Sequence, residues 1–229
     1  MNAQPVTPGR HLLHRRWVYR TLREVWVEDG RVVEKHFRQY SGRRDFRHLW
    51  KREHLALRRL EGLPVPRSLG WKRMRTPEGL DYVLRKTFLP GTPLVQATPR
   101  DAADMGQLLA AIHGRRVVNN DPSTANFIRQ PDGQLACIDF GRSRTFWWAS
   151  SFFYLYVGKE LVRLYRTGLH EDPDLWQTFL ASYHAHSDLL QHHALIITYS
   201  QRFWSWYEER RHPHGTPRPA AASAERNPA

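Results

Sequence analysis

Three polar residues recur at short intervals in the middle of the chain, and their types suit metal binding and proton transfer. Asp121 lies five positions before Asn126, and Asp139 follows Asn126 by thirteen. The segment 126–139 predicts a hairpin with its turn at 131–133, and we expect its register to pair Asn126 with Asp139. A carboxylate beside an amide oxygen suits Mg²⁺, and Asp121 stands where a general base is needed. Each residue alone fits ordinary turn chemistry, so only their combination indicates a site.

Two further charges fall on faces that the pattern predicts to be apolar. Apolar side chains recur at helical spacing over 43–61, and Glu53 falls in the middle of that stripe. In the strand predicted over 32–37, the period of two places Lys35 on the apolar face. A buried carboxylate is costly unless it meets a cation, so we predict an ion pair between Lys35 and Glu53. The alternative is that either side chain extends to solvent at the edge of its element.

The elements that would position these residues change character once along the chain. Strands with a single helix come first, and mainly helical sequence follows a break at 90–93. In chain order the predicted elements are strands over 25–27 and 32–37 joined by an Asp-Gly turn, a helix over 43–61, strands over 69–74 and 81–88, a helix over 99–113 capped by Thr98, the hairpin over 126–139, and helices over roughly 150–212.

This change of pattern predicts an α+β fold with two lobes. We expect an N-terminal lobe over 11–88, consisting of a small antiparallel sheet with one helix, and a mostly helical C-terminal lobe over 89–212. Residues 1–10 are predicted to be a flexible lead. Residues 213–229, rich in Pro and Ala, are predicted to be a disordered tail. Ligands favour the cleft between two such lobes.

The composition is that of a globular protein with an excess of basic residues. Cys137 is the single cysteine and lies in an apolar run, which predicts a buried thiol and a reducing compartment. The sequence contains no apolar stretch of the roughly 20 residues that a spanning helix needs and no signal-peptide core, so we expect a chain without a membrane anchor. The formal net charge of +13 favours an anionic partner.

The polar residues, in their order and spacing, resemble the active site of the protein-kinase-like fold. Asp121-x4-Asn126 followed by Asp139-Phe140-Gly141 resembles its catalytic loop and metal-binding segment. Lys35 stands where that fold has its strand lysine, and Glu53 where it has its helix glutamate. The resemblance extends over about residues 17–185 and implies ATP and Mg²⁺ as ligands.

The same resemblance implies a role for each residue. Asp121 and Lys35 would be catalytic, and Asn126 and Asp139 would hold Mg²⁺. The segment that begins Phe88-Leu89 resembles the hinge that receives adenine. The implied nucleotide-binding residues are Lys35, Glu53, Phe88, Leu89, Asn126 and Asp139.

Within this fold the chain is similar to the bacterial lipopolysaccharide core kinases, the Kdo and heptose kinase family. The similarity rests on a compact unit, on the lack of an Ala-Pro-Glu segment after Asp139, and on basic sequence around a short hairpin. It implies a cytoplasmic enzyme, peripheral to the inner membrane, that phosphorylates a sugar hydroxyl of the lipopolysaccharide inner core. An anionic, lipid-linked sugar acceptor at a membrane surface would suit the net charge. No nucleic-acid partner is expected, and the oligomeric state is left open.

Two departures from the kinase pattern keep other functions open. Residues 18–26 contain no glycine where the fold has a glycine-rich loop, and Asn119 stands where histidine is usual. The alternatives are a small-molecule kinase of the aminoglycoside or choline type, a catalytically impaired kinase-like scaffold that binds anionic lipid or nucleic acid, and, disfavoured by the short segment after Asp139, a protein kinase.

Other polar and aromatic groups carry weaker signals. Arg142 and Arg144 follow the metal-binding segment and could hold an acidic acceptor, although a solvated or structural role is the simpler interpretation. The aromatic residues of 146–156 favour core packing over a membrane-surface role. The spacing of the histidines predicts no zinc site.

Overall fold

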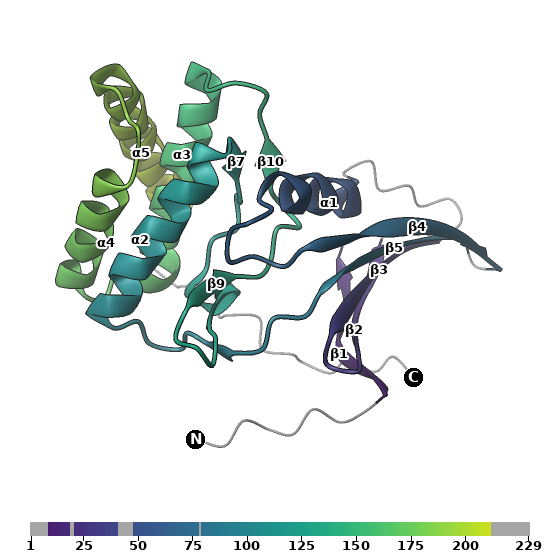
Figure 1. Ribbon diagram of the computed structural model, residues 1–229. Coiled ribbons are helices and arrows are strands. Elements are labelled where there is room, and N and C mark those ends of the chain that lie inside the picture. The colour runs from purple at the N-terminus through teal and green to yellow at the C-terminus, as the bar shows by residue number, and fades with distance from the viewer. Residues whose placement is uncertain (1–8, 19–20, 41–47, 78, 212–229) are drawn as a thin grey trace.

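The computed structural model describes residues 9–18, 21–40, 48–77 and 79–211 of the chain (Figure 1). The fold is α+β, as predicted: an antiparallel sheet and helix α1 lie on one side, and helices α2 to α5 gather on the other. Most of the predicted lead and the whole predicted tail lie outside the described residues. The predicted boundary at 88/89 falls directly after the last strand of the sheet.

The large sheet has five antiparallel strands in the order β1-β2-β3-β5-β4. Their bounds are β1 Arg10–Val18, β2 Thr21–Glu28, β3 Val32–Tyr40, β4 Ser68–Thr76 and β5 Gly79–Thr87. The predicted Asp-Gly turn joins β2 to β3, and Asp29 and Gly30 both take positive φ, at 49° and 59°. Strand β1 was not predicted, and it begins at the last residue of the predicted lead, residues 1–10. It is an edge strand with exposed residues on both faces, so no apolar alternation marks it in the sequence.

Helix α1, Leu49–Arg59, packs against both parts of the molecule. The start of the predicted helix, 43–47, lies outside the described residues. Trp50 stacks on Tyr82 of β5, with ring centroids 4.8 Å apart. One to two turns further on, Ala56 and Leu57 belong to the main core that the later helices form. The helix therefore fixes the position of the sheet relative to the helical part.

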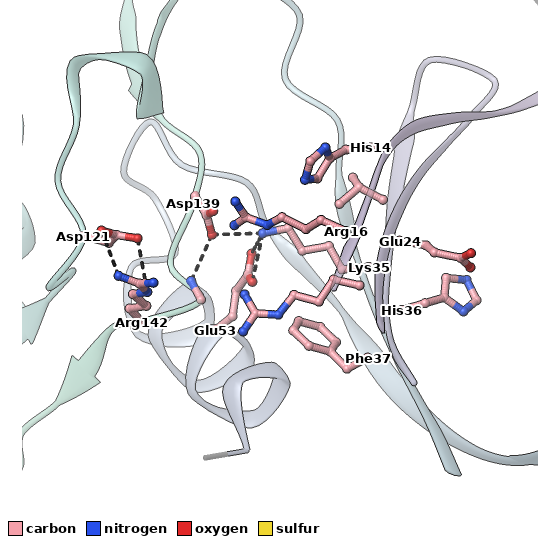
Figure 2. Close-up of a pocket in the computed structure, with 13 residues that line it drawn as sticks. His14, Arg16, Glu24, Lys35, His36, Phe37, Glu53, Asp121, Asp139 and Arg142 are labelled. Atoms are coloured by element: carbon pink, nitrogen blue, oxygen red, sulfur yellow. Dashed lines mark hydrogen bonds and ion pairs between the residues drawn. The ribbon is translucent and has the colours of Figure 1, made fainter. Parts of the chain in front are cut away.

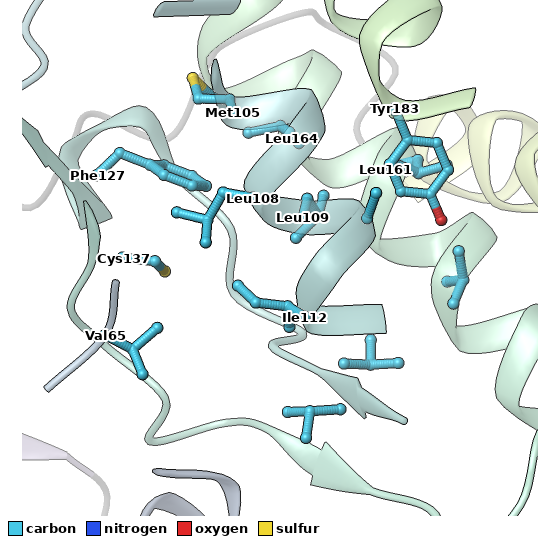
Figure 3. Close-up of a cluster of buried hydrophobic side chains, with 14 of the residues drawn as sticks. Val65, Met105, Leu108, Leu109, Ile112, Phe127, Cys137, Leu161, Leu164 and Tyr183 are labelled. Atoms are coloured by element: carbon cyan, nitrogen blue, oxygen red, sulfur yellow. The ribbon is translucent and has the colours of Figure 1, made fainter. Parts of the chain in front are cut away.

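The main core lies among the later helices (Figure 3). The helices are α2 Pro99–Gly114, α3 Ser151–Leu164 with a π-helical turn at Tyr165–Leu169, α4 Pro173–Ala185 and α5 Gln191–Arg211. Helix α2 begins as predicted, and Thr98 and Asp101 form a capping box. Gly106 allows α2 and α4 to approach closely, because a Cβ there would lie 2.5 Å from the carbonyl oxygen of Phe179.

Short strands hold the loops that carry the central polar residues. They are β6 Thr92–Pro93, β7 Val117–Val118, β8 Phe127–Arg129, β9 Leu135–Cys137 and β10 Arg144–Thr145, with a 3₁₀ turn at Thr124–Asn126. Strands β6, β8 and β9 form one small sheet, and β7 pairs with β10.

The hairpin is present, but its predicted register is wrong by one residue. Arg129 pairs with Leu135, so the loop is symmetric about Asp132. The N–H of Ile138 donates to the carbonyl of Asn126 at 3.0 Å. Asn126 therefore lies opposite Ile138. Asp139 lies beyond the end of β9, on the segment that leads to Gly141.

Candidate active site

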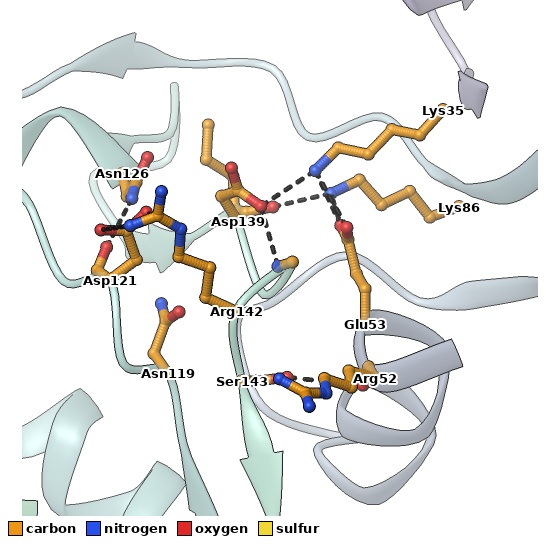
Figure 4. A network of polar contacts seen from close by, with 12 residues as sticks. Lys35, Arg52, Glu53, Lys86, Asn119, Asp121, Asn126, Asp139, Arg142 and Ser143 are labelled. Atoms are coloured by element: carbon orange, nitrogen blue, oxygen red, sulfur yellow. Dashed lines mark hydrogen bonds and ion pairs between the residues drawn. The ribbon is translucent and has the colours of Figure 1, made fainter. Parts of the chain in front are cut away.

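Lys35 lies at the centre of a cluster of charges between the sheet and the helical part (Figure 4). Its Nζ donates to both carboxylate oxygens of Glu53, at 2.9 and 3.0 Å, and to Oδ1 of Asp139 at 3.0 Å. The Glu53 side chain is fully buried, and that of Lys35 is 14% exposed. The predicted ion pair is therefore confirmed. Asp139 reaches it from a position 104 residues further along the chain.

A second lysine, which the sequence interpretation missed, binds the same glutamate. Nζ of Lys86, on β5, donates to Oε1 of Glu53 and to the carbonyl of Ile138, both at 2.7 Å. Lys86 is buried, and it follows the fully buried Leu84 by two positions. The period of two that placed Lys35 on an inner face also places Lys86 there. That signal was present in the sequence.

Two ammonium groups and two carboxylates thus make a compact, electrically balanced cluster. Burial alone would raise the pKa of Asp139, but the charges of Lys35 and Lys86 and the N–H of Gly141 hold it well below its ordinary value. Burial alone would lower the pKa of Lys35, but Asp139 and Glu53 raise it above the usual range. For Lys86 burial outweighs the attraction of Glu53, so its pKa is lowered.

Asp121 lies across the cleft from Lys35 and is held by arginines. Nη2 of Arg163 contacts its Oδ1 at 2.7 Å, and Nε of Arg142 contacts its Oδ2 at 3.3 Å. Its side chain is 37% exposed, so solvent and ligands can reach it. Two guanidinium groups therefore fix the direction in which this carboxylate points.

The loop that carries Asp121 is anchored from below by another residue that sequence reasoning missed. Glu160, on α3, is fully buried, and its Oε2 accepts the N–H of Asn120 at 3.3 Å. The same oxygen lies 3.5 Å from Nε2 of His113. Asn119 is also buried, and its Nδ2 lies 3.7 Å from Sγ of Cys137. These contacts give the loop a fixed base.

Asn126 belongs to the same loop and is oriented by it. Its Nδ2 donates to the backbone carbonyl of Asp121 at 2.9 Å, and its amide oxygen points away from that carbonyl (Figure 4). The described residues show no direct hydrogen bond between Asn126 and Asp139. Nor do they contain a group of three or more His, Cys, Asp or Glu side chains arranged to hold a metal ion. The predicted pair therefore remains a prediction as a metal site.

A cleft brings these groups together (Figure 2). Lys35, Glu53, Asp121 and Asp139 line it from both sides. Arg16 on β1 and Arg23 on β2 are register partners that also line it. Like charges directly opposed on neighbouring strands repel each other. The pair places two positive charges on the sheet side of the cleft.

The predicted hinge residues lie apart from this cleft. Phe88 and Leu89 follow β5 directly, are half-buried, and are absent from the described lining of the cleft. The N–H of Phe88 donates to the carbonyl of Arg31 at 2.7 Å, so that N–H is not available to a ligand. An adenine contact at this segment stays a prediction.

The remaining predictions have mixed outcomes. Cys137 is buried as expected, and burial raises the pKa of its thiol to about 12. Phe153 and Tyr154 pack in the core as predicted. Trp147 and Trp148 do not, because they are 87% and 71% exposed on the connection to α3.

No helix of the described chain combines the length and apolarity that crossing a bilayer requires.

Comparisons with known proteins add little to this geometry. No family model matches the chain, and no curated protein matches its sequence. Among solved structures, the chain is similar to the crystal structure of WbdD, with 16% sequence identity and a TM-score of 0.46, covering 83% of this chain and 50% of that one. The chain thus spans about half the length of WbdD. A likeness of this size carries no argument about function, which therefore rests on the site itself.

Proposed function

We propose that the protein is an ATP-dependent phosphotransferase with a protein-kinase-like fold. The observation that carries the proposal is the position of Lys35, whose Nζ joins Glu53 of α1 to Asp139 of the helical part in the cleft that Asp121 also lines. A lysine oriented by a glutamate, a metal-binding aspartate and a carboxylate on a nearby loop are the parts that phosphoryl transfer needs.

Lys35 would hold the α- and β-phosphates of ATP. Its ammonium group is fixed in place by Glu53, so binding costs little reorganisation. Arg16 and Arg23 would supply further charge from the β1–β2 pair, in place of the missing glycine-rich loop. Backbone groups of Leu89 would receive the adenine.

The residues present fit a magnesium ion. Oδ1 of Asp139 is occupied by Lys35 and by the N–H of Gly141, whereas Oδ2 has no hydrogen-bond partner among the described residues. The amide of Asn126 is fixed through its nitrogen, which leaves its oxygen available as a ligand for a cation. Carboxylate and amide oxygens are ligands that Mg²⁺ prefers. Bound there with the phosphates, the ion would neutralise the charge that develops during transfer.

Asp121 would act as the general base. It would accept the proton of an acceptor hydroxyl as that oxygen bonds to the γ-phosphorus and the bond to the β–γ bridging oxygen breaks, releasing ADP. Arg163 and Arg142 hold the carboxylate in one orientation, and the buried contact of Glu160 with the loop keeps it at a fixed depth. Positioning of this kind supplies most of the catalysis in phosphoryl transfer.

The acceptor would be a sugar hydroxyl of the lipopolysaccharide inner core, with the enzyme in the cytoplasm and peripheral to the inner membrane. The net charge of +13 favours an anionic, lipid-linked acceptor. The exposed Trp147 and Trp148 are residues that favour a membrane interface. A small-molecule kinase of the aminoglycoside or choline type is the competing function.

Transfer of radiolabelled γ-phosphate from Mg-ATP tests the proposal. The acceptors are purified core oligosaccharide lacking phosphate, an aminoglycoside, and choline. We expect transfer to the oligosaccharide that falls at least about 100-fold in Asp121→Asn, the scale of general-base catalysis, while Asp188→Asn, an exposed aspartate far along the chain, is unchanged. Equal transfer by native protein and Asp121→Asn would refute the assignment. Transfer to choline or the aminoglycoside alone would show that the acceptor is a small molecule and not the core sugar.

A further inference from the structure

A second cleft opens beside Asp121 between α1, α3 and the β10 segment. Its described lining combines basic side chains from five elements or loops with few other groups. The six basic residues are Arg23, Arg52, Arg142, Arg144, Lys159 and Arg163, and they are joined by Leu49, Asn120 and Tyr156. Among the described residues that line it, none is acidic. The first cleft, by contrast, mixes both signs of charge.

Two of the basic side chains lie against aromatic rings. Arg144 lies over the ring of Tyr156, 4.5 Å from its centroid, and Lys159 lies over Trp204 at 4.1 Å. Such contacts with ring faces are weaker than an ion pair with a carboxylate. Asp121 pairs with Arg163 and Arg142 at the rim, and the described lining of the cleft itself contains no carboxylate. Gathering like charges in a concave site raises the local potential and attracts anions.

The two clefts are continuous at the residues that surround the proposed base. Arg23 and Arg142 line both of them. Arg163 lines the second cleft and also holds Asp121. An acceptor that binds one of its groups among these cations would therefore be able to present a hydroxyl group to Asp121.

We propose that the second cleft binds a phosphate group that the acceptor already carries, so that the enzyme phosphorylates an acceptor that is already phosphorylated. Guanidinium groups match phosphate oxygens in paired hydrogen bonds, and five of the six cations are arginines. The phosphate would draw Arg142 and Arg163 toward itself and free the Asp121 carboxylate to receive the hydroxyl proton. The catalytic part of this inference rests on the proposed function, whereas the binding of phosphate does not.

Titration calorimetry with inorganic phosphate and with glucose 6-phosphate tests the site, using glucose as the uncharged comparison. We expect both phosphates to bind and glucose not to bind. The triple variant Arg52→Gln/Arg144→Gln/Lys159→Gln should bind phosphate at least about tenfold more weakly, since charge-assisted hydrogen bonds are lost. These residues do not contact Asp121. The matched control is Arg100→Gln, an exposed arginine on α2 that lines neither cleft, and it should bind like the native protein.

The titrations are repeated with a saturating non-hydrolysable Mg-ATP analogue, which separates this inference from the proposed function. Phosphate binding that survives the analogue supports the second cleft. Phosphate binding that the analogue abolishes, or that is equal in native protein and the triple variant, overturns it. Failure of the analogue itself to bind would count against the proposed function and leave the phosphate measurement valid. The single variant Lys159→Gln is titrated alongside, and its weaker phosphate binding replaces that of the triple variant if the triple variant unfolds.

Discussion

The two charged regions of this protein differ in balance and in depth. Around Glu53, two lysines and two carboxylates neutralise one another, and the glutamate and Lys86 are shielded from water. Around the second cleft, six basic side chains, most of them half-buried, gather with no carboxylate in the described lining. A balanced, buried cluster holds its own geometry without a ligand, whereas a group of like charges that solvent can reach gains most when a ligand supplies the opposite charge.

The difference assigns different tasks to the two regions. The buried cluster is a rigid base that joins the sheet, α1 and the Asp139 segment, so its loss should affect folding first. The cations of the second cleft should contribute little to stability and much to recognition. Stability, pH dependence and salt dependence should separate the two tasks.

The largest expected effect is on stability, in Glu53→Gln. The substitution keeps the shape of the side chain but leaves two buried ammonium groups without their shared carboxylate. We expect the free energy of unfolding, from urea titration, to fall by about 3–5 kcal/mol. Glu61→Gln, at an exposed position just after α1, should change it by less than about 0.5 kcal/mol. Similar losses in the two variants would show that the cluster is not the structural centre.

A smaller effect is expected in the pH dependence of the free energy of unfolding, and it should distinguish Lys86 from an exposed lysine. Burial lowers the pKa of Lys86 from its ordinary 10.5 in the folded state, so the unfolded chain binds more protons just below pH 10.5 and stability rises with pH there. Lys86→Met, which keeps the length of the side chain, should lack this rise. Lys35 acts in the opposite direction only above pH 10.5, because its pKa is raised. Parallel stability curves for native protein and Lys86→Met between pH 8 and 10.5 would contradict the assignment.

The smallest effect is one of salt, and it should appear in only one region. Raising NaCl from about 50 to about 500 mM shortens the screening length from ~14 to ~4 Å. Phosphate binding in the second cleft should weaken several-fold over this range. The difference in unfolding free energy between native protein and Glu53→Gln should change by less than about 0.5 kcal/mol. Equal salt sensitivity of the two quantities would remove the distinction between the regions.

The sequence predicts the buried region much better than the exposed one. Lys35 and Glu53 could be paired because each interrupts an apolar period that one element sets, and that signal is local. Lys86 obeys the same rule and was within reach. The hairpin register was off by one residue, although the predicted turn 131–133 is centred on Asp132 as the structure shows, because a register centred there opposes Asn126 to Ile138. Consequently the prediction that Asn126 lies opposite Asp139 was wrong.

The second cleft could not be found in the sequence. Arg52 and Lys159 come from helices more than a hundred positions apart, and neither interrupts an apolar pattern. Arg142 and Arg144 were noticed only because they follow Asp139. A surplus of charge is visible in the composition, but its concentration in one place depends on how α1 and α3 pack.

Magnesium-dependent binding of ATP, measured by calorimetry on native protein, Lys35→Met and Asp139→Asn, tests the central claim most directly. The proposed site predicts that native protein binds ATP only with Mg²⁺ present, that Lys35→Met loses most of the affinity, and that Asp139→Asn loses the dependence on Mg²⁺. Circular dichroism of each variant establishes that it is folded. Binding of equal strength in all three folded proteins, or binding that ignores Mg²⁺ in the native protein, would contradict the claim that these residues form a nucleotide site.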